Sequence, residues 1–186
     1  MSEIDHIVSV LKEGGTILYP TDTTWGLGCD ATSSQAVAEL FKIKIPTPEL
    51  PTIILVDSLM MLHRHVEEVH PRVETLLSYH QRPLTVVYDK GRLLASELLG
   101  EGGSVAIRMT LDPFCKEIIS ELGKPIVATA ATYGDFGYPY RFEDVAMDMV
   151  KNVDYVVRYK QDQVSLEDPS VIVRLTERAE LDFIRE

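Results

Sequence analysis

The sequence predicts an α/β or α+β protein, and three observations support this class. Helical and extended patterns alternate from end to end, which is typical of strands interleaved with helices around a sheet. The 186 residues fit one domain, or one domain with a small lobe. Hydrophobic residues make up 45% of the chain and charged residues 25%, enough apolar material to form a core. We therefore expect residues 1–186 to form a single domain.

Residues that start or stop regular structure divide the first half of the chain into elements. Ser2 can cap a first helix, whose apolar stripe ends at Gly14 and Gly15. Prolines between residues 46 and 51 enforce an extended connection. The elements expected in this half are, in order, that first helix, a strand at 16–19, a helix starting at Ser33 or Ser34, a strand at 53–56, a helix capped by Asp57 or Ser58, a helix at 71–79 and a strand at 84–88.

The second half continues the alternation. Asp112 and Pro113 open a helix that ends at Gly123, with proline at the first helical position. The segment 160–169 has the strongest loop character. Around these lie a strand at 104–108, a strand at 125–129, a short helix at 142–150, and strands at 154–159, 171–175 and 181–185.

Charge and cysteine content narrow the function classes. Asp and Glu number 29 against 18 Lys and Arg, a formal net charge of −11, which argues against an obligate nucleic-acid binder but allows a local basic pocket for a small anion. Cys29 and Cys115 have no zinc-site spacing, so we expect reduced thiols that pack as small hydrophobic groups. The acidic N-terminus lacks signal-peptide features, and no apolar run reaches the ~20 residues of a membrane span. We expect a cytoplasmic protein without a membrane partner.

Residues 20–30, PTDTTWGLGCD, carry the densest group of candidate binding residues. They follow a strand and bring together threonine hydroxyls, a carboxylate and glycines. Such groups at the end of a strand suit a small polar ligand. A turn in which Thr and Asp side chains satisfy backbone groups is an equally supported interpretation.

The run YPTDTTWGLGCDA also resembles the signature of the YrdC/YciO family, in which Tyr commonly stands where Trp25 stands here. The resemblance continues along nearly the whole chain in the family's order. It covers the helix at 36–44, the strand at 51–56, the strand entry Pro83-Leu84-Thr85, the V-x-V-R-like strand at 105–108, the strand at 125–129, and the closing segments 168–170 and 183–185.

This resemblance implies a fold and an activity. The fold is a single twisted mixed β-sheet flanked by helices, with a concave ligand groove. The best-known members condense threonine, bicarbonate and ATP into threonylcarbamoyl-adenylate with release of pyrophosphate, for threonylcarbamoyl-adenosine modification of tRNA. The implied ligands are ATP with Mg²⁺, threonine and bicarbonate, and the implied partners are tRNA-modification proteins; direct contact with nucleic acid is not expected at a charge of −11.

The resemblance also implies roles for individual residues. Lys44 stands at a catalytic lysine and would bind nucleotide together with Thr85, Thr132 and Arg185. Thr23, Arg108 and Ser170 would bind substrate. The residues alone allow other interpretations, a solvated lysine at Lys44 and surface charges at Arg108 and Arg185.

Three of the four residues in the family's Lys, Arg, Ser, Asn active-site set differ here. The family arginine falls on Pro46, and the Ser-Ala-Asn motif on Ala130-Ala131-Thr132. Losing one charge-assisted contact to a charged transition state commonly costs ~10²-fold in rate. Thr132 keeps a hydroxyl, and Lys42, Lys124 or Arg141 could compensate from unknown positions. A diverged paralogue that binds a nucleotide or another small ligand without this catalysis is therefore the alternative, and an RNA-binding module is a third, weaker one.

Two further segments suggest sites. His63, His65 and His70 lie within eight residues, but helical spacing turns the first two to different faces and no cysteine is near, so we expect a solvated surface and no metal site. The aromatic segment 133–140 could stack on a base or cover the groove, and we favour covering.

Overall fold

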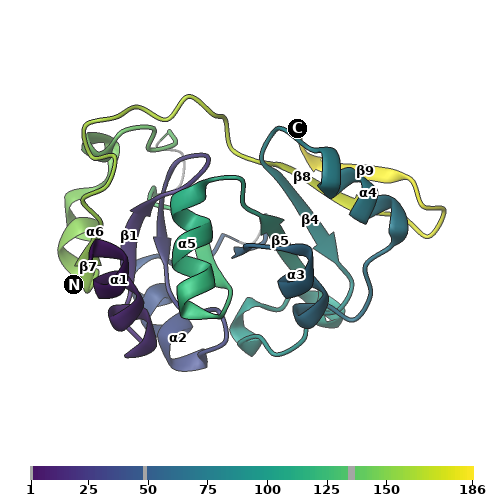
Figure 1. Cartoon of the computed structure of the whole chain (residues 1–186), viewed down its shortest axis with the longest axis horizontal. Coiled ribbons are helices and arrows are strands. Elements are labelled where there is room, and N and C mark those ends of the chain that lie inside the picture. The colour runs from purple at the N-terminus through teal and green to yellow at the C-terminus, as the bar shows by residue number, and fades with distance from the viewer. Residues whose placement is uncertain (1, 48–49, 134–136) are drawn as a thin grey trace.

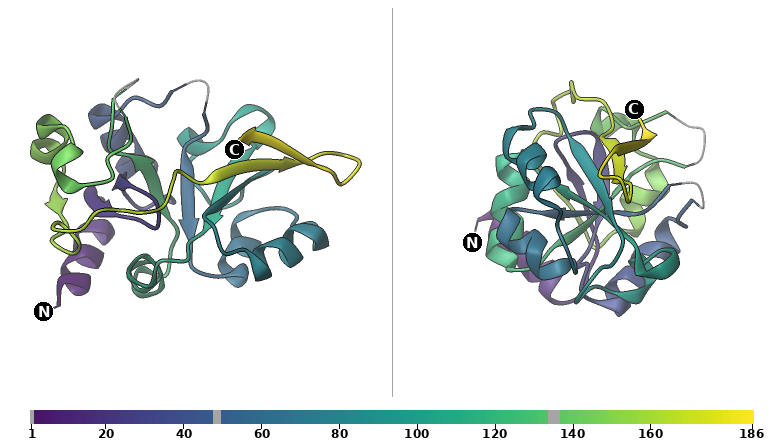
Figure 2. Two further views of the ribbon diagram at one scale, coloured as in Figure 1. Left: turned by 90° about the horizontal axis from the view of Figure 1, so that it is seen from above. Right: turned by 90° about the vertical axis from the view of Figure 1, so that its right-hand side faces the viewer.

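The computed structural model describes residues 2–47, 50–133 and 137–186. Within these residues nine strands form one sheet in the order β7-β1-β2-β6-β3-β5-β4-β8-β9. Figures 1 and 2 show α5 (Pro113–Leu122), α3 (Leu59–His65) and α4 (Pro71–Tyr79) on one side of the sheet and α2 (Ser34–Ile43) on the other. The strands are β1 (Ile17–Pro20), β2 (Trp25–Gly28), β3 (Ile53–Val56), β4 (Leu84–Tyr88), β5 (Val105–Met109), β6 (Ile126–Ala130), β7 (Tyr155–Val156), β8 (Val171–Leu175) and β9 (Leu181–Arg185).

The sheet is mixed, as expected. β3 pairs with β5, β4 with β8 and β1 with β7 in parallel, and every other neighbouring pair is antiparallel. The hairpin formed by β8 and β9 extends from one end of the molecule (Figure 1). β1 and β9 lie near opposite ends of this strand order, yet the turn after β1, β5 and the end of β9 all contribute residues to one groove.

The helices begin and end at residues whose side chains or backbone satisfy helix termini. Ser2 accepts a bond from the Asp5 amide in a capping box, and Asp112 caps α5, which stops at Gly123 with φ of 71°. The helices are α1 (Glu3–Lys12), α2 (Ser34–Ile43), α3 (Leu59–His65), α4 (Pro71–Tyr79), α5 (Pro113–Leu122) and α6 (Met147–Asn152), with 3₁₀ turns η1 (Ser96–Leu98), η2 (Glu101–Gly103) and η3 (Phe142–Asp144). None of the described helices is long and apolar enough to cross a membrane.

Three expectations about elements were wrong. Strand β2 was not expected, because its two glycines and polar neighbours resemble a turn; pairing with β1 on one side and β6 on the other makes it a strand. The single helix at 142–150 is instead η3 followed by α6. The strand at 154–159 reduces to the two residues of β7, where pairing with β1 ends.

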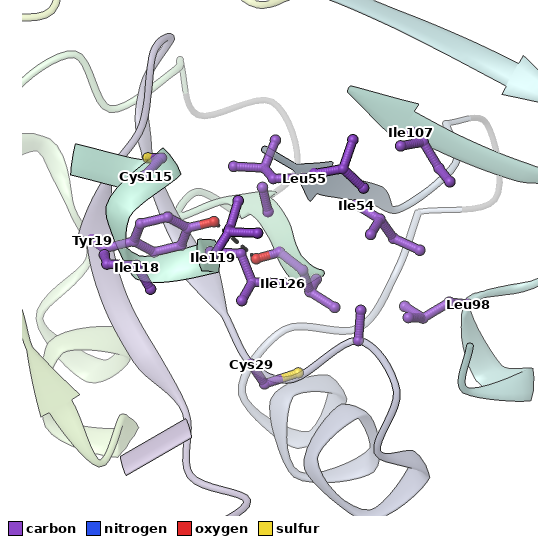
Figure 3. Packing of buried hydrophobic residues seen from close by; sticks show 14 of the residues in the cluster. Tyr19, Cys29, Ile54, Leu55, Leu98, Ile107, Cys115, Ile118, Ile119 and Ile126 are labelled. Carbon is purple, nitrogen blue, oxygen red and sulfur yellow. Dashed lines mark hydrogen bonds between the residues drawn. The ribbon is translucent and has the colours of Figure 1, made fainter. Parts of the chain in front are cut away.

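The core beside β1 and β6 contains Tyr19, whose ring is fully buried between the sheet and α5 (Figure 3). Its hydroxyl donates a hydrogen bond to the Val127 carbonyl at 2.9 Å, so the one polar atom of the side chain is satisfied. Cys29 and Cys115 are fully buried and unbridged, which confirms small hydrophobic packing. Burial raises the pKa of both thiols, so neither is a reactive thiolate.

Candidate functional site

A groove of about 330 Å³ lies over the sheet where β1, β5 and β6 meet the segments around β8 and β9. Its wall combines threonine hydroxyls from the turn after β1, Lys44 after α2, Arg108 on β5, residues 128–130 of β6, and Ser170 and Arg185 from the C-terminal segment. Of the seven residues assigned by sequence, six line it: Thr23, Lys44, Arg108, Thr132, Ser170 and Arg185.

The turn between β1 and β2 supports both interpretations of this segment. The Thr21 hydroxyl donates to the Thr24 carbonyl at 2.8 Å and accepts from the amides of Thr23 and Thr24, so it satisfies the turn's backbone. The Thr23 hydroxyl lies 3.0 Å from that of Thr21. All three threonines line the groove, and the turn therefore presents hydroxyls to a ligand while it closes on itself.

Arg108 is a buried cation at the groove, not a surface charge. It follows the apolar run of β5, and its side chain is 3% exposed. One guanidinium nitrogen, Nη2, lies 2.9 Å from Oδ1 of Asp22, a carboxylate that is itself 7% exposed. The Asp22 Oδ2 accepts a bond from the Leu111 amide at 3.2 Å, which ties the carboxylate to the chain after β5.

Ser170 joins two of the other predicted residues. Its hydroxyl lies 2.8 Å from the Thr85 hydroxyl, and both side chains are buried. Thr85 itself does not line the groove; the structure places it behind Ser170, where it can act on a ligand only by fixing the Ser170 hydroxyl. The Ser170 carbonyl accepts bonds from Arg185 Nε at 2.9 Å and Nη2 at 2.7 Å.

Arg185, at the end of β9, closes one side of the groove. In addition to Ser170, it contacts the Tyr138 hydroxyl through Nη1 at 3.4 Å. Burial lowers its pKa from the ordinary value, but a guanidinium keeps its proton in proteins, so the group remains a cation. Its half-buried side chain is held by the Ser170 carbonyl and the Tyr138 hydroxyl, so it is not a loose surface charge.

Lys44 is also held in the groove. It lies at the C-terminal cap of α2, and its ammonium donates to the Ala130 carbonyl at 2.5 Å. Burial lowers the pKa of Lys44 to about 8, because desolvation disfavours the charged amine. The solvated-lysine interpretation is therefore wrong for this residue.

The three positions at which the family resemblance implies a replaced active-site residue all line the same groove. Pro46 and Ala130 line it without a side-chain donor, and Thr132 lines it with a hydroxyl that donates to the Gly137 carbonyl at 3.1 Å. The three cationic residues that were considered as possible compensation lie outside the groove lining. Lys42 pairs with Glu39 on the surface at 2.6 Å, Lys124 pairs with Asp30 at 2.6 Å, and Arg141 precedes η3 outside the groove lining.

The groove is locally positive although the chain is strongly negative. Among the described residues that line it are three cationic side chains, Lys44, Arg108 and Arg185, and no carboxylate. Asp22 lies behind Arg108 and lines a second cavity, of about 370 Å³, on the other side of the threonine turn. The net charge allowed a local basic pocket, and the described groove lining forms one that suits anionic ligands.

The three histidines contact different partners, and one residue of the aromatic segment lines the groove. His63 pairs with Glu74 at 2.5 Å, His65 is buried against the Arg92 carbonyl, and His70 caps α4. Of the aromatic segment, Tyr138 lines the groove beside Arg185, while residues 134–136 lie outside the described residues.

Comparison with known proteins agrees with this geometry. The model of the family Sua5_yciO_yrdC, described as "Telomere recombination", matches residues 9–186. A threonylcarbamoyl-AMP synthase of Pseudoalteromonas translucida is 28% identical over 159 residues, covering 84% of this chain and 85% of that protein. Its counterpart from Klebsiella pneumoniae is 31% identical over 131 residues, covering 69% of each chain.

Two solved structures share the fold. Sua5 from P. abyssi, in a complex with L-threonine, superposes with a TM-score of 0.84 at 26% identity over 95% of this chain, which spans about half (52%) of the Sua5 chain. YciO from E. coli also gives a TM-score of 0.84, at 21% identity, covering 98% of this chain and 88% of that chain. Groove, sheet and sequence agree, and the chain belongs to the Sua5/YciO/YrdC family.

Proposed function

We propose that this protein makes threonylcarbamoyl-adenylate from L-threonine, bicarbonate and ATP, and releases pyrophosphate. One observation carries the proposal: an acidic chain forms a groove whose described lining has three cations, several hydroxyls and no carboxylate. All three substrates carry anionic oxygens, which such a groove attracts. Relatives named threonylcarbamoyl-AMP synthase, and a related Sua5 complexed with L-threonine, support the same activity.

In the proposed reaction, the threonine amine first combines with bicarbonate with loss of water, which gives an N-carboxylate. An oxygen of this N-carboxylate, not of the threonine α-carboxylate, then attacks the α-phosphorus of ATP. A new P–O bond forms, and the bond to pyrophosphate breaks. Lys44 neutralises charge on the phosphates, and Thr132 and Arg185 bind the nucleotide, with Thr85 fixing Ser170 beside them. Thr23, Arg108 and Ser170 orient the threonine, so that the attacking oxygen is held close to phosphorus.

The described groove lining fits Mg²⁺ only as a complex with ATP. It presents no carboxylate, the usual protein ligand of this ion, so phosphate oxygens and water would hold the metal. When bound, Mg²⁺ supplies further charge neutralisation at the phosphates.

The product would pass to proteins that modify tRNA, in the cytoplasm. Direct capture of tRNA by this chain is disfavoured by its charge of −11.

A second candidate function is binding of a nucleotide or a related small anion without turnover. The observation that favours it is the loss of side-chain donors at Pro46 and Ala130 on the groove wall, with Thr132 replacing the family asparagine. Both candidates use the same groove, and they differ in whether pyrophosphate is released.

Pyrophosphate release separates the two candidates when each substrate is omitted in turn. We expect release only with threonine, bicarbonate and ATP together, and a loss of about 10²-fold or more in Lys44→Ala. Lys42→Ala is the matched control, because this neighbouring lysine pairs with Glu39 on the surface and should leave the rate unchanged. ATP binding without release would favour the second candidate, and release that does not require threonine would contradict the first.

A further inference from the structure

Asp22 does not line the groove, but it forms an ion pair with a residue that does. It is absent from the groove lining, lines the second cavity behind the threonine turn, and forms its ion pair with Arg108, which does line the groove. We propose that Asp22 is a positioning residue: it fixes the Arg108 guanidinium so that the remaining N–H groups of this side chain bind an oxyanion of the ligand. This inference rests on the proposed function, since the ligand it concerns is the one bound in that groove.

The carboxylate is well placed to hold the guanidinium still. Asp22 Oδ1 is 2.9 Å from Arg108 Nη2, and the two side chains are 7% and 3% exposed. Water screens such a pair little, so the attraction is stronger than between surface charges. The Leu111 amide holds the other carboxylate oxygen, so Asp22 is anchored to the segment that follows β5.

Arg108 nevertheless has unused donor capacity. Its Nε is buried and has no hydrogen-bond partner among the described residues, and the contact between Nη2 and Asp22 Oδ1 lacks the geometry of a hydrogen bond. Buried donors are rarely left without a partner, and each one calls for an explanation. A ligand oxygen in the groove would supply the partner, because a guanidinium donates to carboxylate or phosphate oxygens along two parallel bonds.

Two ligand oxyanions share this chemistry, the carboxylate of threonine and a phosphate of ATP. L-Threoninol, which replaces the carboxylate with an alcohol, separates them. If Arg108 holds the carboxylate, disturbing its position weakens binding of L-threonine and not of L-threoninol. If it holds a phosphate, the affinity for ATP falls instead.

The test compares Asp22→Asn with wild type and with a matched control. Asparagine keeps the shape and an acceptor for the Leu111 amide but removes the charge. Asp30→Asn is the control, because Asp30 is also a buried carboxylate with one cationic partner, Lys124, and neither lines the groove. Affinities for L-threonine, L-threoninol and ATP are measured by calorimetry, and folding is followed by the melting temperature.

We expect Asp22→Asn to weaken either L-threonine or ATP binding about 10- to 100-fold, the range of one charge-assisted hydrogen bond. Asp30→Asn should leave both affinities unchanged even if it melts earlier. In an Arg108→Ala background, Asp22→Asn should cause no further loss, because Asp22 acts through Arg108. Unchanged affinities in Asp22→Asn, or an equal loss in Asp30→Asn, would overturn the inference.

A second measurement tests the role of Asp22 without depending on the proposed catalytic activity. The Arg108 Nε–H resonance, assigned by its absence in Arg108→Lys, reports the position of the guanidinium without turnover. We expect inorganic phosphate to shift it in wild type and not in Asp22→Asn. A wild type that releases no pyrophosphate but shows this difference would refute the synthase and support Asp22; identical signals in both proteins would overturn the role of Asp22 even in an active enzyme.

Discussion

Pro46→Arg places a cation at the position where the family resemblance implies an arginine, and it tests whether charge at this position limits the rate. Pro46 is exposed on the groove wall and follows the end of α2 at Ile43, so the substitution interrupts no helix. Proline has no backbone N–H to lose, and the new side chain has solvent space in which to reach the phosphates. It would be the fourth cation beside Lys44, Arg108 and Arg185.

The size of the gain follows from where the new charge lies. A donor aimed at developing charge in a closed site is worth about 10²-fold, or about 2.7 kcal/mol of the barrier. Water screens an exposed guanidinium, so we expect about tenfold in kcat from Pro46→Arg alone. Adding Ala130→Ser and Thr132→Asn rebuilds the neighbouring wall, and we expect the triple variant to gain about 10²-fold over wild type.

The assay is steady-state pyrophosphate release at saturating threonine, bicarbonate and ATP. Pro51→Arg is the matched control, since Pro51 is also exposed on the groove wall and receives the same charge at another position. A rise specific to Pro46→Arg supports a defined arginine site. An equal rise in both variants would show that the rate depends only on the overall electrostatic potential of the groove, and not on a cation at position 46. No gain in the triple variant, with ATP still bound, would refute the reasoning, because these positions would then not limit the rate.

Three further predictions concern charge, packing and positioning. ATP affinity should fall as the pH rises through about 8, because Lys44 loses its proton there. The Lys44→Arg variant should keep its ATP affinity over the same pH range, and calorimetry below and above pH 8 checks both. Gly28→Ala should lower the free energy of unfolding by about 1–3 kcal/mol, because its new Cβ would lie 2.6 Å from a Tyr19 ring carbon. Urea titration measures this change, and an unchanged unfolding midpoint would contradict the close packing of Gly28 against Tyr19. Ser170→Ala should weaken ATP binding less than Arg185→Ala does, because Arg185 keeps its bonds to the Ser170 carbonyl; the reverse order would contradict this arrangement.

Helices and strands that consist of an apolar or amphipathic run, bounded by residues that start or stop regular structure, could be predicted from the sequence. The strands at 53–56, 84–88, 171–175 and 181–185 and the helix at 71–79 have the expected bounds, because each is an apolar or amphipathic run with a clear stop. Strand β2 could not be predicted in this way. It forms because it pairs with β1 and β6, and β6, which begins at Ile126, lies far along the chain from β2.

The site was predicted through the family resemblance more than through local pattern. That resemblance brought Thr23, Lys44, Arg108 and Arg185 to one groove, and the structure places all four there. Asp22 received no role, because one acid in a polar turn gives no sign of a buried partner on a distant strand. Whether each residue does the chemistry assigned to it stays a prediction.

The central claim is that the groove joins threonine, bicarbonate and ATP, and the product itself tests it most directly. Purified protein would be incubated with L-threonine, ATP, Mg²⁺ and ¹³C-labelled bicarbonate, and the quenched mixture analysed at once by mass spectrometry. We expect an adenylate that contains threonine and one labelled carbon, formed in step with pyrophosphate and absent in Lys44→Ala. Bound ATP that stays intact, or AMP formed without the labelled carbon, would contradict it.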